Sequence, residues 1–156
     1  MSRRAQIRMT DEEVRKFLEQ TRTLILCSIG KDGFPHPMPM WFGLEEDATV
    51  VMTTFTKSQK IQNLKRDPRV SLLAEAGEDY PELRGVMIRG KAEIDAEVES
   101  VFATLRKVSL RMGAVRAEDS EAVREGLRAS ARKRCLIRVK PEKVVSWDHR
   151  KLGGVY

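Results

Sequence analysis

Residues 53–70 read Thr-Thr-Phe-Thr-Lys-Ser-Gln-Lys-Ile-Gln-Asn-Leu-Lys-Arg-Asp-Pro-Arg-Val, a stretch that runs from a strand end through a helix to a further strand. The apolar residues 50–52 before it predict the first strand, Ser58 is a suitable N-cap, and Asp67-Pro68 ends the helix. The first turn of such a helix has free backbone N–H groups and the positive end of the helix dipole. The pattern therefore predicts either an anion-binding helix start or an ordinary capped surface helix.

The side chains around this helix start favour a phosphate. Lys57 and Lys60, three residues apart, add formal charge to the first turn. Hydroxyl groups of Thr53, Thr54, Thr56 and Ser58 lie close to them in the sequence and are suitable hydrogen-bond donors. If the stretch binds a ligand, these residues are the candidates.

Composition limits the protein to a few classes. With 156 residues, 41% of them hydrophobic, the chain suits one domain over residues 1–156 with a real core. No apolar run approaches the roughly 20 residues needed to cross a bilayer, and the N-terminus lacks the apolar region of a secretory signal. We therefore expect a cytoplasmic protein with no membrane partner. Cys27 and Cys135 lie in apolar runs, which is typical of small buried side chains.

The net charge of +6 raises the question of a nucleic-acid partner. Its distribution argues against one, because basic and acidic residues are interleaved, aromatic residues make up only 6%, and no RNA-binding or zinc-finger signature occurs. We expect no nucleic-acid partner. A small basic nucleic-acid-binding barrel is the alternative that steep salt-dependent binding to random DNA would support.

The rest of the chain predicts antiparallel strands with helices inserted between them. Strands are expected over residues 23–29, 34–44, 49–54, 69–74, 84–95, 136–140 and 144–147, and helices over residues 11–20, 58–66, 96–112 and 118–132. Within residues 84–95 apolar and small residues alternate with charged ones, so one face of that strand belongs to the core. This order favours a β-barrel or α+β fold over a doubly wound parallel sheet.

Three prolines alternate in the second of these strands, at Pro35, Pro37 and Pro39. In an extended chain their missing N–H groups all fall on one edge, which cannot donate to a neighbouring strand. That edge therefore either lies at the border of a sheet or faces something other than a strand, and a flat ligand ring is one candidate.

The sequence lacks the side chains of the common catalytic sites. Only His36 and His149 are available as triad bases, and no nucleophile elbow, dinucleotide fingerprint or Walker loop occurs. Two scattered histidines and two core-like cysteines predict no metal site. We predict no catalytic acid or base among the side chains, and so we expect a bound cofactor to carry the reaction.

Three segments together resemble the FMN-binding split β-barrels similar to pyridoxamine 5′-phosphate oxidase. They are residues 33–43 (Gly-Phe-Pro-His-Pro-Met-Pro-Met-Trp-Phe-Gly), residues 53–70 and residues 84–94 (Arg-Gly-Val-Met-Ile-Arg-Gly-Lys-Ala-Glu-Ile). The resemblance covers nearly all of the chain. It implies a mainly β (α+β) fold, a six-stranded antiparallel split β-barrel with flanking helices, and a homodimer with cofactor bound at the interface.

The resemblance also implies which residues bind the cofactor. It places Met38, Pro39, Met40 and Trp41 beside the ring, Thr53 and Thr54 at the ribityl chain or phosphate, and Lys57, Ser58 and Lys60 at the phosphate. Asn63 either contacts the cofactor or makes an internal helix hydrogen bond. Trp147 either lines the substrate pocket or anchors the barrel as a buried aromatic residue.

A branch of the same superfamily resembles this chain as closely and uses the deazaflavin coenzyme F-420, which carries a polyglutamate tail. Lys65, Arg66 and Arg69 supply charge that suits such a tail, so the cofactor is predicted to be coenzyme F-420 or FMN. We expect a flavin- or deazaflavin-dependent oxidoreductase acting on a small molecule, with a non-catalytic carrier or sensor protein as the alternative. The C-terminal residues 147–150 differ in order from the Arg-x-His pair of true pyridoxamine phosphate oxidases, so vitamin B6 oxidation is not implied.

Overall fold

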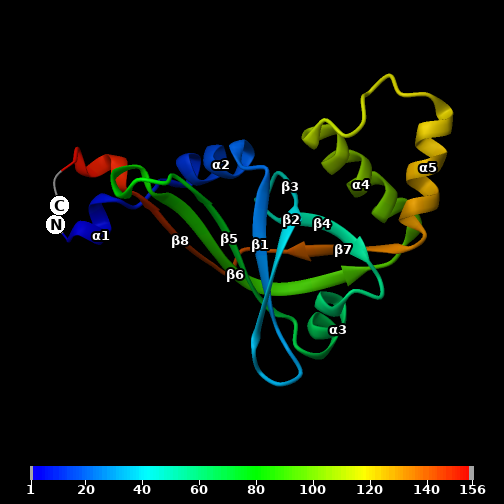
Figure 1. Ribbon diagram of the computed structural model, residues 1–156, viewed down its shortest axis with the longest axis horizontal. Helices are drawn as coiled ribbons and strands as arrows, with labels where there is room; N and C mark the ends of the chain where they lie inside the picture. The colour runs from blue at the N-terminus through cyan, green and yellow to red at the C-terminus, as the bar shows by residue number, and fades with distance from the viewer. Residues whose placement is uncertain (1, 155–156) are drawn as a thin grey trace.

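The strands of the computed structural model, which describes residues 2–154, form one antiparallel sheet that curls into a barrel (Figure 1). They are β1 (Thr23–Ile29), β2 (Pro35–Trp41), β3 (Gly43–Leu44), β4 (Val50–Phe55), β5 (Arg69–Ala76), β6 (Arg84–Asp95), β7 (Arg134–Val139) and β8 (Lys143–Asp148). The strand order is β2-β1-β5-β6-β7-β4-β3, and β8 pairs with β6. This architecture confirms the predicted split barrel.

Eight strands occupy six barrel positions because two pairs of strands continue each other. Only Phe42 separates β2, which pairs with β1, from β3, which pairs with β4. In the same way β7 and β8 follow each other along one edge of the long β6. At the bend between them a Cβ on Gly90 would lie 2.5 Å from the carbonyl oxygen of Lys140, so the close approach requires glycine.

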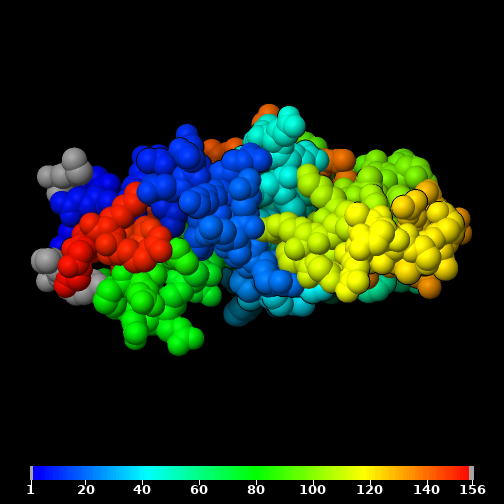
Figure 2. Space-filling model, turned by 90° about the horizontal axis from the view of Figure 1, so that it is seen from above, coloured from blue at the N-terminus to red at the C-terminus, as the bar shows by residue number. Residues whose placement is uncertain are grey.

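Helices and short turns flank the barrel. They are α1 (Arg3–Gln6), α2 (Asp11–Gln20), α3 (Gln59–Arg66), α4 (Val98–Met112) and α5 (Glu121–Ala131), with 3-10 turns η1 (Tyr80–Glu82) and η2 (His149–Leu152). Figure 2 shows an elongated molecule, with α1 and η2 side by side at one end and the α4–α5 region at the other. None of the helices in residues 2–154 is long and apolar enough to cross a membrane. The cytoplasmic location stays a prediction.

The core fills the barrel, and helices close both of its ends. Inward residues of the strands pack with Ile61 and Leu64 of α3 and with Phe17 and Leu18 of α2. Figure 1 shows α2 and α3 at opposite ends of the barrel. A second cluster joins α4 and α5 to the outside of β4 and β7 through Val51, Val101, Ala131 and Leu136.

The proline strand lies at the border of the ladder, as its missing donors require. Pro35, Pro37 and Pro39 stand opposite Ile29, Cys27 and Ile25 of β1, and no strand of residues 2–154 pairs with the other edge of β2. The residues between the prolines therefore provide the donors to β1. Of the two alternatives that the prolines left open, the border position is confirmed.

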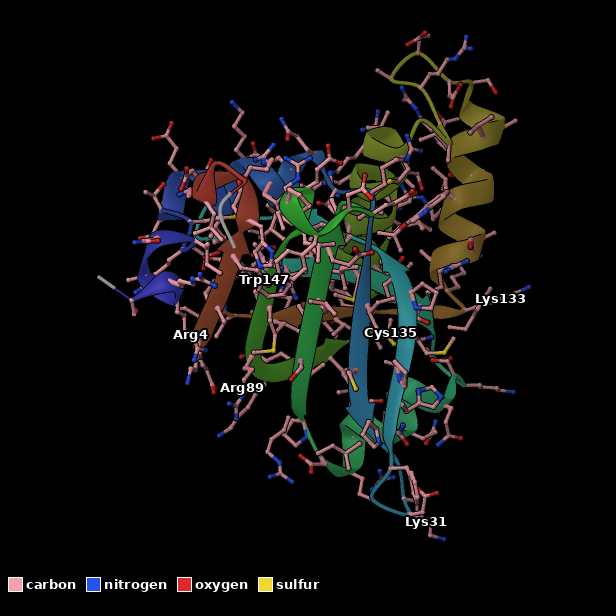
Figure 3. All side chains as sticks on the ribbon, turned by 60° about the vertical axis from the view of Figure 1, so that its left-hand side comes forward. Arg4, Lys31, Arg89, Lys133, Cys135 and Trp147 are labelled. Carbon is pink, nitrogen blue, oxygen red and sulfur yellow. The ribbon has the colours of Figure 1, made fainter. Side chains whose placement is uncertain are left out.

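One outer face of the sheet carries a row of apolar side chains that none of the described helices covers. The register places Ile25, Leu73, Met87 and Val145 in one row across β1, β5, β6 and β8, and each is only partly buried. Figure 3 shows these strands side by side with the helices at their margins. We call this surface the open sheet face.

The packing of α3 predicts a large effect of truncating Ile61, which is fully buried. We expect Ile61→Ala to lower the free energy of unfolding by about 2 to 4 kcal/mol, because it removes buried methylene groups and leaves a cavity. Urea denaturation measures this loss. Gln62→Ala, at the exposed neighbouring position, is the control, and similar losses for both variants would contradict the role of α3 as a core element.

Candidate functional site

The candidate site begins where β4 ends and α3 starts. Backbone hydrogen bonds hold the short connection in place: the N–H of Thr56 donates to the carbonyl oxygen of Lys133 over 3.1 Å, and that of Ser58 donates to Phe55 over 3.0 Å. Strand alternation turns Thr54 toward the barrel interior, where it is buried. The connection therefore presents a fixed arrangement of polar groups.

Ser58 occupies the N-cap position of α3, but its side chain does not accept a hydrogen bond from the first turn of the helix. Its Oγ is buried without a hydrogen-bond partner among the described residues. The backbone N–H groups of Gln59 and Lys60 have no acceptor within residues 2–154, as is usual in the first turn of a helix, and Gln59 is exposed. The buried Oγ of Ser58 is the costly group, because a buried polar atom without a partner destabilises the fold. A ligand that hydrogen-bonds to this hydroxyl and to the first-turn N–H groups would suit the helix start.

Lys60 brings a positive charge to the same place. The side chain is only 8% exposed, and its Nζ donates to Oγ1 of Thr54 over 3.1 Å. In the described part of the chain no carboxylate lies within 4.0 Å of it. Burial lowers the pKa of Lys60 below its ordinary value. We call Thr54, Ser58, the free N–H groups and Lys60 the anion cradle, because a bound anion would complete it.

Two other residues predicted at the phosphate are less central. Lys57 is exposed and forms no ion pair with any described residue. Thr53 is half-buried, and strand alternation turns it away from Thr54, toward the side that α4 and α5 cover. Only the backbone of Thr53 can face the cradle.

Asn63 makes an internal hydrogen bond within α3, which was one of the two roles that the sequence left open for it. It is fully buried, its Nδ2 donates to Oγ of Ser28 over 3.0 Å, and its Oδ1 accepts a hydrogen bond from Nε2 of Gln59 over 2.9 Å. The amide thus connects α3 to β1. In this way it fixes the position of the helix that carries the cradle.

The predicted ring-binding segment on β2 presents apolar surface. Met38 and Trp41 are 36% and 49% exposed and Pro39 is exposed, while Met40 lies in the core. β2 contacts β4, at whose end the cradle lies. Strand alternation places the side chains of Met38 and Trp41 on opposite faces of β2. Only one of these two side chains can therefore lie against the same cofactor ring.

Trp147 lies in a different part of the chain's fold. Its half-buried indole covers Gly85 on β6, where a Cβ would lie 2.4 Å from Cζ2 of the tryptophan. Figure 3 labels Trp147 on β8 and Cys135 on β7. Trp147 stands opposite Gly85 in the ladder, whereas Cys135 stands opposite Thr54 of the cradle. Within one chain the structure does not bring Trp147 to the cradle.

Sequence reasoning gave too little weight to His36 and Gln59. Both line a pocket between the β1–β2 loop and α3, and Nδ1 of His36 is buried without a partner in residues 2–154. Strand alternation places His36 on the same face of β2 as the buried Met40. Among the described residues, no group of three or more His, Cys, Asp or Glu side chains has the arrangement of a metal site.

Comparison with known proteins adds the family context. The family model described as pyridoxamine 5′-phosphate oxidase matches residues 10–148. A conserved hypothetical protein from Mycobacterium tuberculosis has 36% sequence identity and a TM-score of 0.88, with 100% of this chain and 95% of that chain covered. No curated protein sequence matches the chain.

Two further solved structures share the fold at lower identity. An F-420 reductase has 24% identity and a TM-score of 0.67, covering 86% of this chain and 98% of that one. A FAD-binding protein from Mesorhizobium loti has 18% identity and a TM-score of 0.64, covering 88% and 94%. Proteins with this fold thus include some named for flavin-type cofactors.

The uncompensated charge of Lys60 predicts that the residue costs stability. Because folding lowers its pKa, the unfolded chain holds the proton more tightly, and the penalty shrinks as pH rises through the folded-state pKa. We expect Lys60→Met to raise the free energy of unfolding of the cofactor-free protein at neutral pH by about 1 to 3 kcal/mol. Urea denaturation at several pH values measures the difference, and a destabilised Lys60→Met protein would contradict it.

Proposed function

Because the chain belongs to the pyridoxamine 5′-phosphate oxidase family, we propose that it is an oxidoreductase that uses FMN or coenzyme F-420 to act on a small molecule. The observation that carries the proposal is the anion cradle, where a buried lysine without a counter-ion adjoins a buried hydroxyl without a partner. The phosphate of such a cofactor supplies the acceptors and the negative charge that these groups lack.

The chain's own residues would bind and orient the cofactor. Thr54, Ser58 and Lys60 would hold its phosphate together with the free N–H groups of α3, while the apolar surface of Met38–Trp41 would lie against its ring. When bound, the cofactor supplies hydride or electron transfer, which no side chain of the protein provides. The protein would contribute position, exclusion of water and a positive field at the phosphate.

The choice between FMN and coenzyme F-420 rests on the groups beyond the phosphate. Of the three basic residues that suit a polyglutamate tail, two already have partners: the Arg66 guanidinium donates to the carbonyl oxygen of Ile29, and Arg69 forms an ion pair with Asp67 over 2.7 Å. Their charge is therefore a weaker argument for a tail than the sequence suggested. The F-420 reductase among similar structures supports the deazaflavin, and both cofactors remain in the proposal.

We propose in addition that the protein is a homodimer joined through the open sheet face. The row of Ile25, Leu73, Met87 and Val145 is an apolar surface that no described helix covers, and large uncovered apolar surfaces commonly mark interfaces. Trp147 lies on the same face by strand alternation. A homodimer formed through this face would place Trp147 at the subunit interface. The family resemblance implies that the cofactor binds at the same interface.

Titration of the apoprotein with FMN and with coenzyme F-420 tests the cofactor site. We expect Lys60→Ala to weaken binding of the preferred cofactor about 10- to 100-fold, because it removes a buried charge-assisted hydrogen bond. Lys65→Ala, on the exposed last turn of α3, is the charge-matched control and should change binding little. Equal dissociation constants for the two variants would exclude the cradle as the phosphate site. Turnover with a panel of electron acceptors then distinguishes an enzyme from a carrier or sensor.

Light scattering tests the homodimer. We expect Leu73→Arg to yield a folded monomer with reduced cofactor affinity, since it places a charge in the apolar row. Val123→Arg is the matched control, because Val123 is an exposed apolar residue on α5, away from that face. Circular dichroism establishes that both variants fold. A wild-type monomer at micromolar concentration would refute the dimer.

A further inference from the structure

The ring-binding segment on β2 ends at a bend that lies between the C-terminal ends of α2 and α4 (Figure 1). Only Phe42 separates β2 from β3, and its side chain is fully buried. At this residue the chain leaves β1 and begins to pair with β4, which carries the anion cradle at its other end. The bend therefore determines how β2 lies relative to the cradle.

Arg111, in the last turn of α4, binds the backbone at this bend. Its Nη1 donates to the carbonyl oxygen of Phe42 over 2.5 Å, and its Cζ lies 4.5 Å from the centre of the Phe42 ring. Its Nη2 donates to a group of carbonyl oxygens at the end of α2, those of Leu18 at 2.7 Å, Glu19 at 2.9 Å and Thr21 at 2.7 Å. One planar side chain thus connects the end of α2 to the bend that follows β2.

The two attachment points of Arg111 lie at the same end of the β1–β2 pair. Thr21 is two residues before Thr23, the first residue of β1, and Thr23 stands opposite Trp41, the last residue of β2. No strand of residues 2–154 pairs with the other edge of β2. The end of β2 is therefore held by β1 on one side and by the contacts of α4 with Phe42.

The preceding turn of α4 supports the same bend. Lys107, four positions before Arg111, donates from Nζ to the carbonyl oxygen of Leu44 over 2.6 Å. Gly43 lies so close to α4 that a Cβ on it would come within 3.5 Å of Cγ2 of Val108. Arg111 takes part in none of the ion pairs of residues 2–154, so backbone carbonyl groups are the acceptors of its guanidinium.

We propose that Arg111 is a positioning residue for the cofactor ring, which acts through Phe42 by setting where β2 lies relative to the cradle. The inference rests on the proposed function and makes it more specific. The ribityl chain gives the ring a limited reach from the phosphate, so a shift of β2 would move the ring-binding groups away from the ring. Arginine suits this role because its planar fork donates in two directions while its face stacks on an aromatic ring.

A purely structural role for Arg111 is the competing interpretation. A cation that binds the last carbonyl groups of a helix stabilises that helix, and Arg111 does this for α2. Such a role changes the stability of the protein but not the environment of a bound ring. The bond to Phe42 and the stacking on its ring lie outside α2, and they favour the positioning role.

Titration of the apoprotein with FMN and with riboflavin, which has the same ring but no phosphate, tests the positioning role. We expect Arg111→Lys to raise the Kd of both compounds about fivefold or more and to shift the absorption spectrum of the bound ring, because lysine keeps the charge but not the fork. Lys60→Ala should weaken FMN more than riboflavin, since it acts on the phosphate. If coenzyme F-420 is the preferred cofactor, it and its phosphate-free deazariboflavin are the two probes.

Amide hydrogen exchange adds a measurement that needs no cofactor. In the apoprotein of Arg111→Lys, the amides of residues 38–44 should exchange faster, because the bend has lost its contacts with α4. Arg22→Ala is the matched control. Arg22 donates to the carbonyl oxygen of Met112 over 2.8 Å and so joins α4 to the chain before β1 without contacting Phe42. It should change both dissociation constants by less than about twofold and leave the spectrum unchanged.

The outcomes separate the positioning role from the function on which it rests. If the wild type binds neither cofactor, the proposed function fails and the positioning role with it. If the wild type binds and Arg111→Lys folds with unchanged dissociation constants and spectrum, Arg111 only stabilises α2 and the inference alone is overturned. An equal spectral shift in Arg22→Ala overturns it as well. If circular dichroism shows that Arg111→Lys does not fold, Phe42→Leu, which removes the ring under the guanidinium, decides by the same measurements.

Discussion

The structure around the candidate site depends on one constraint: the ammonium group of Lys60 is buried at the end of the barrel without a counter-ion among residues 2–154. Its place follows from the apolar packing of α3. Lys60 precedes Leu64 by four positions, so the packing that buries Leu64 and Ile61 carries Lys60 inward with them. Thr54 meets it because strand alternation turns that residue into the barrel. The cradle therefore depends on the hydrophobic core, and the core on that side includes a charge that an anion would neutralise.

This arrangement shows why part of the fold could be predicted and part could not. Residues 84–95 alternate so regularly that the bounds and the buried face of β6 were predicted, and both are confirmed. Pro35, Pro37 and Pro39 determined an edge strand through a purely local property, the lack of a donor. The burial of Lys60 was missed because a lysine in a first helical turn is usually solvated. The spacing from Lys60 to Leu64 was the available signal.

Contacts between distant segments explain the remaining differences. The strand predicted over residues 34–44 divides at Phe42 because β2 pairs with β1 and β3 pairs with β4, a change of partner that no local pattern encodes. The short α1 has too few residues for a helical period. The partner of Asn63 is Ser28, which lies on β1 and far away in the sequence. Sequence periodicity locates the elements, whereas the neighbours of each polar group become visible only when the barrel closes.

The basic residues near α3 show that contacts formed in the fold also change the argument about which ligand the protein binds. Counted in the sequence, Arg66 and Arg69 are available charges, but in the fold the Arg66 guanidinium holds the end of β1 and Arg69 pairs with Asp67. Salt bridges and carbonyl contacts of this kind satisfy donors that a ligand would otherwise use. The groups that remain are fewer and more specific. They are the buried hydroxyl of Ser58, which has no partner among the described residues, and the buried Nζ of Lys60, which donates to Thr54 but has no counter-ion among them. A ligand is therefore better inferred from donors and cations that the protein leaves unpaired than from the total of its charges.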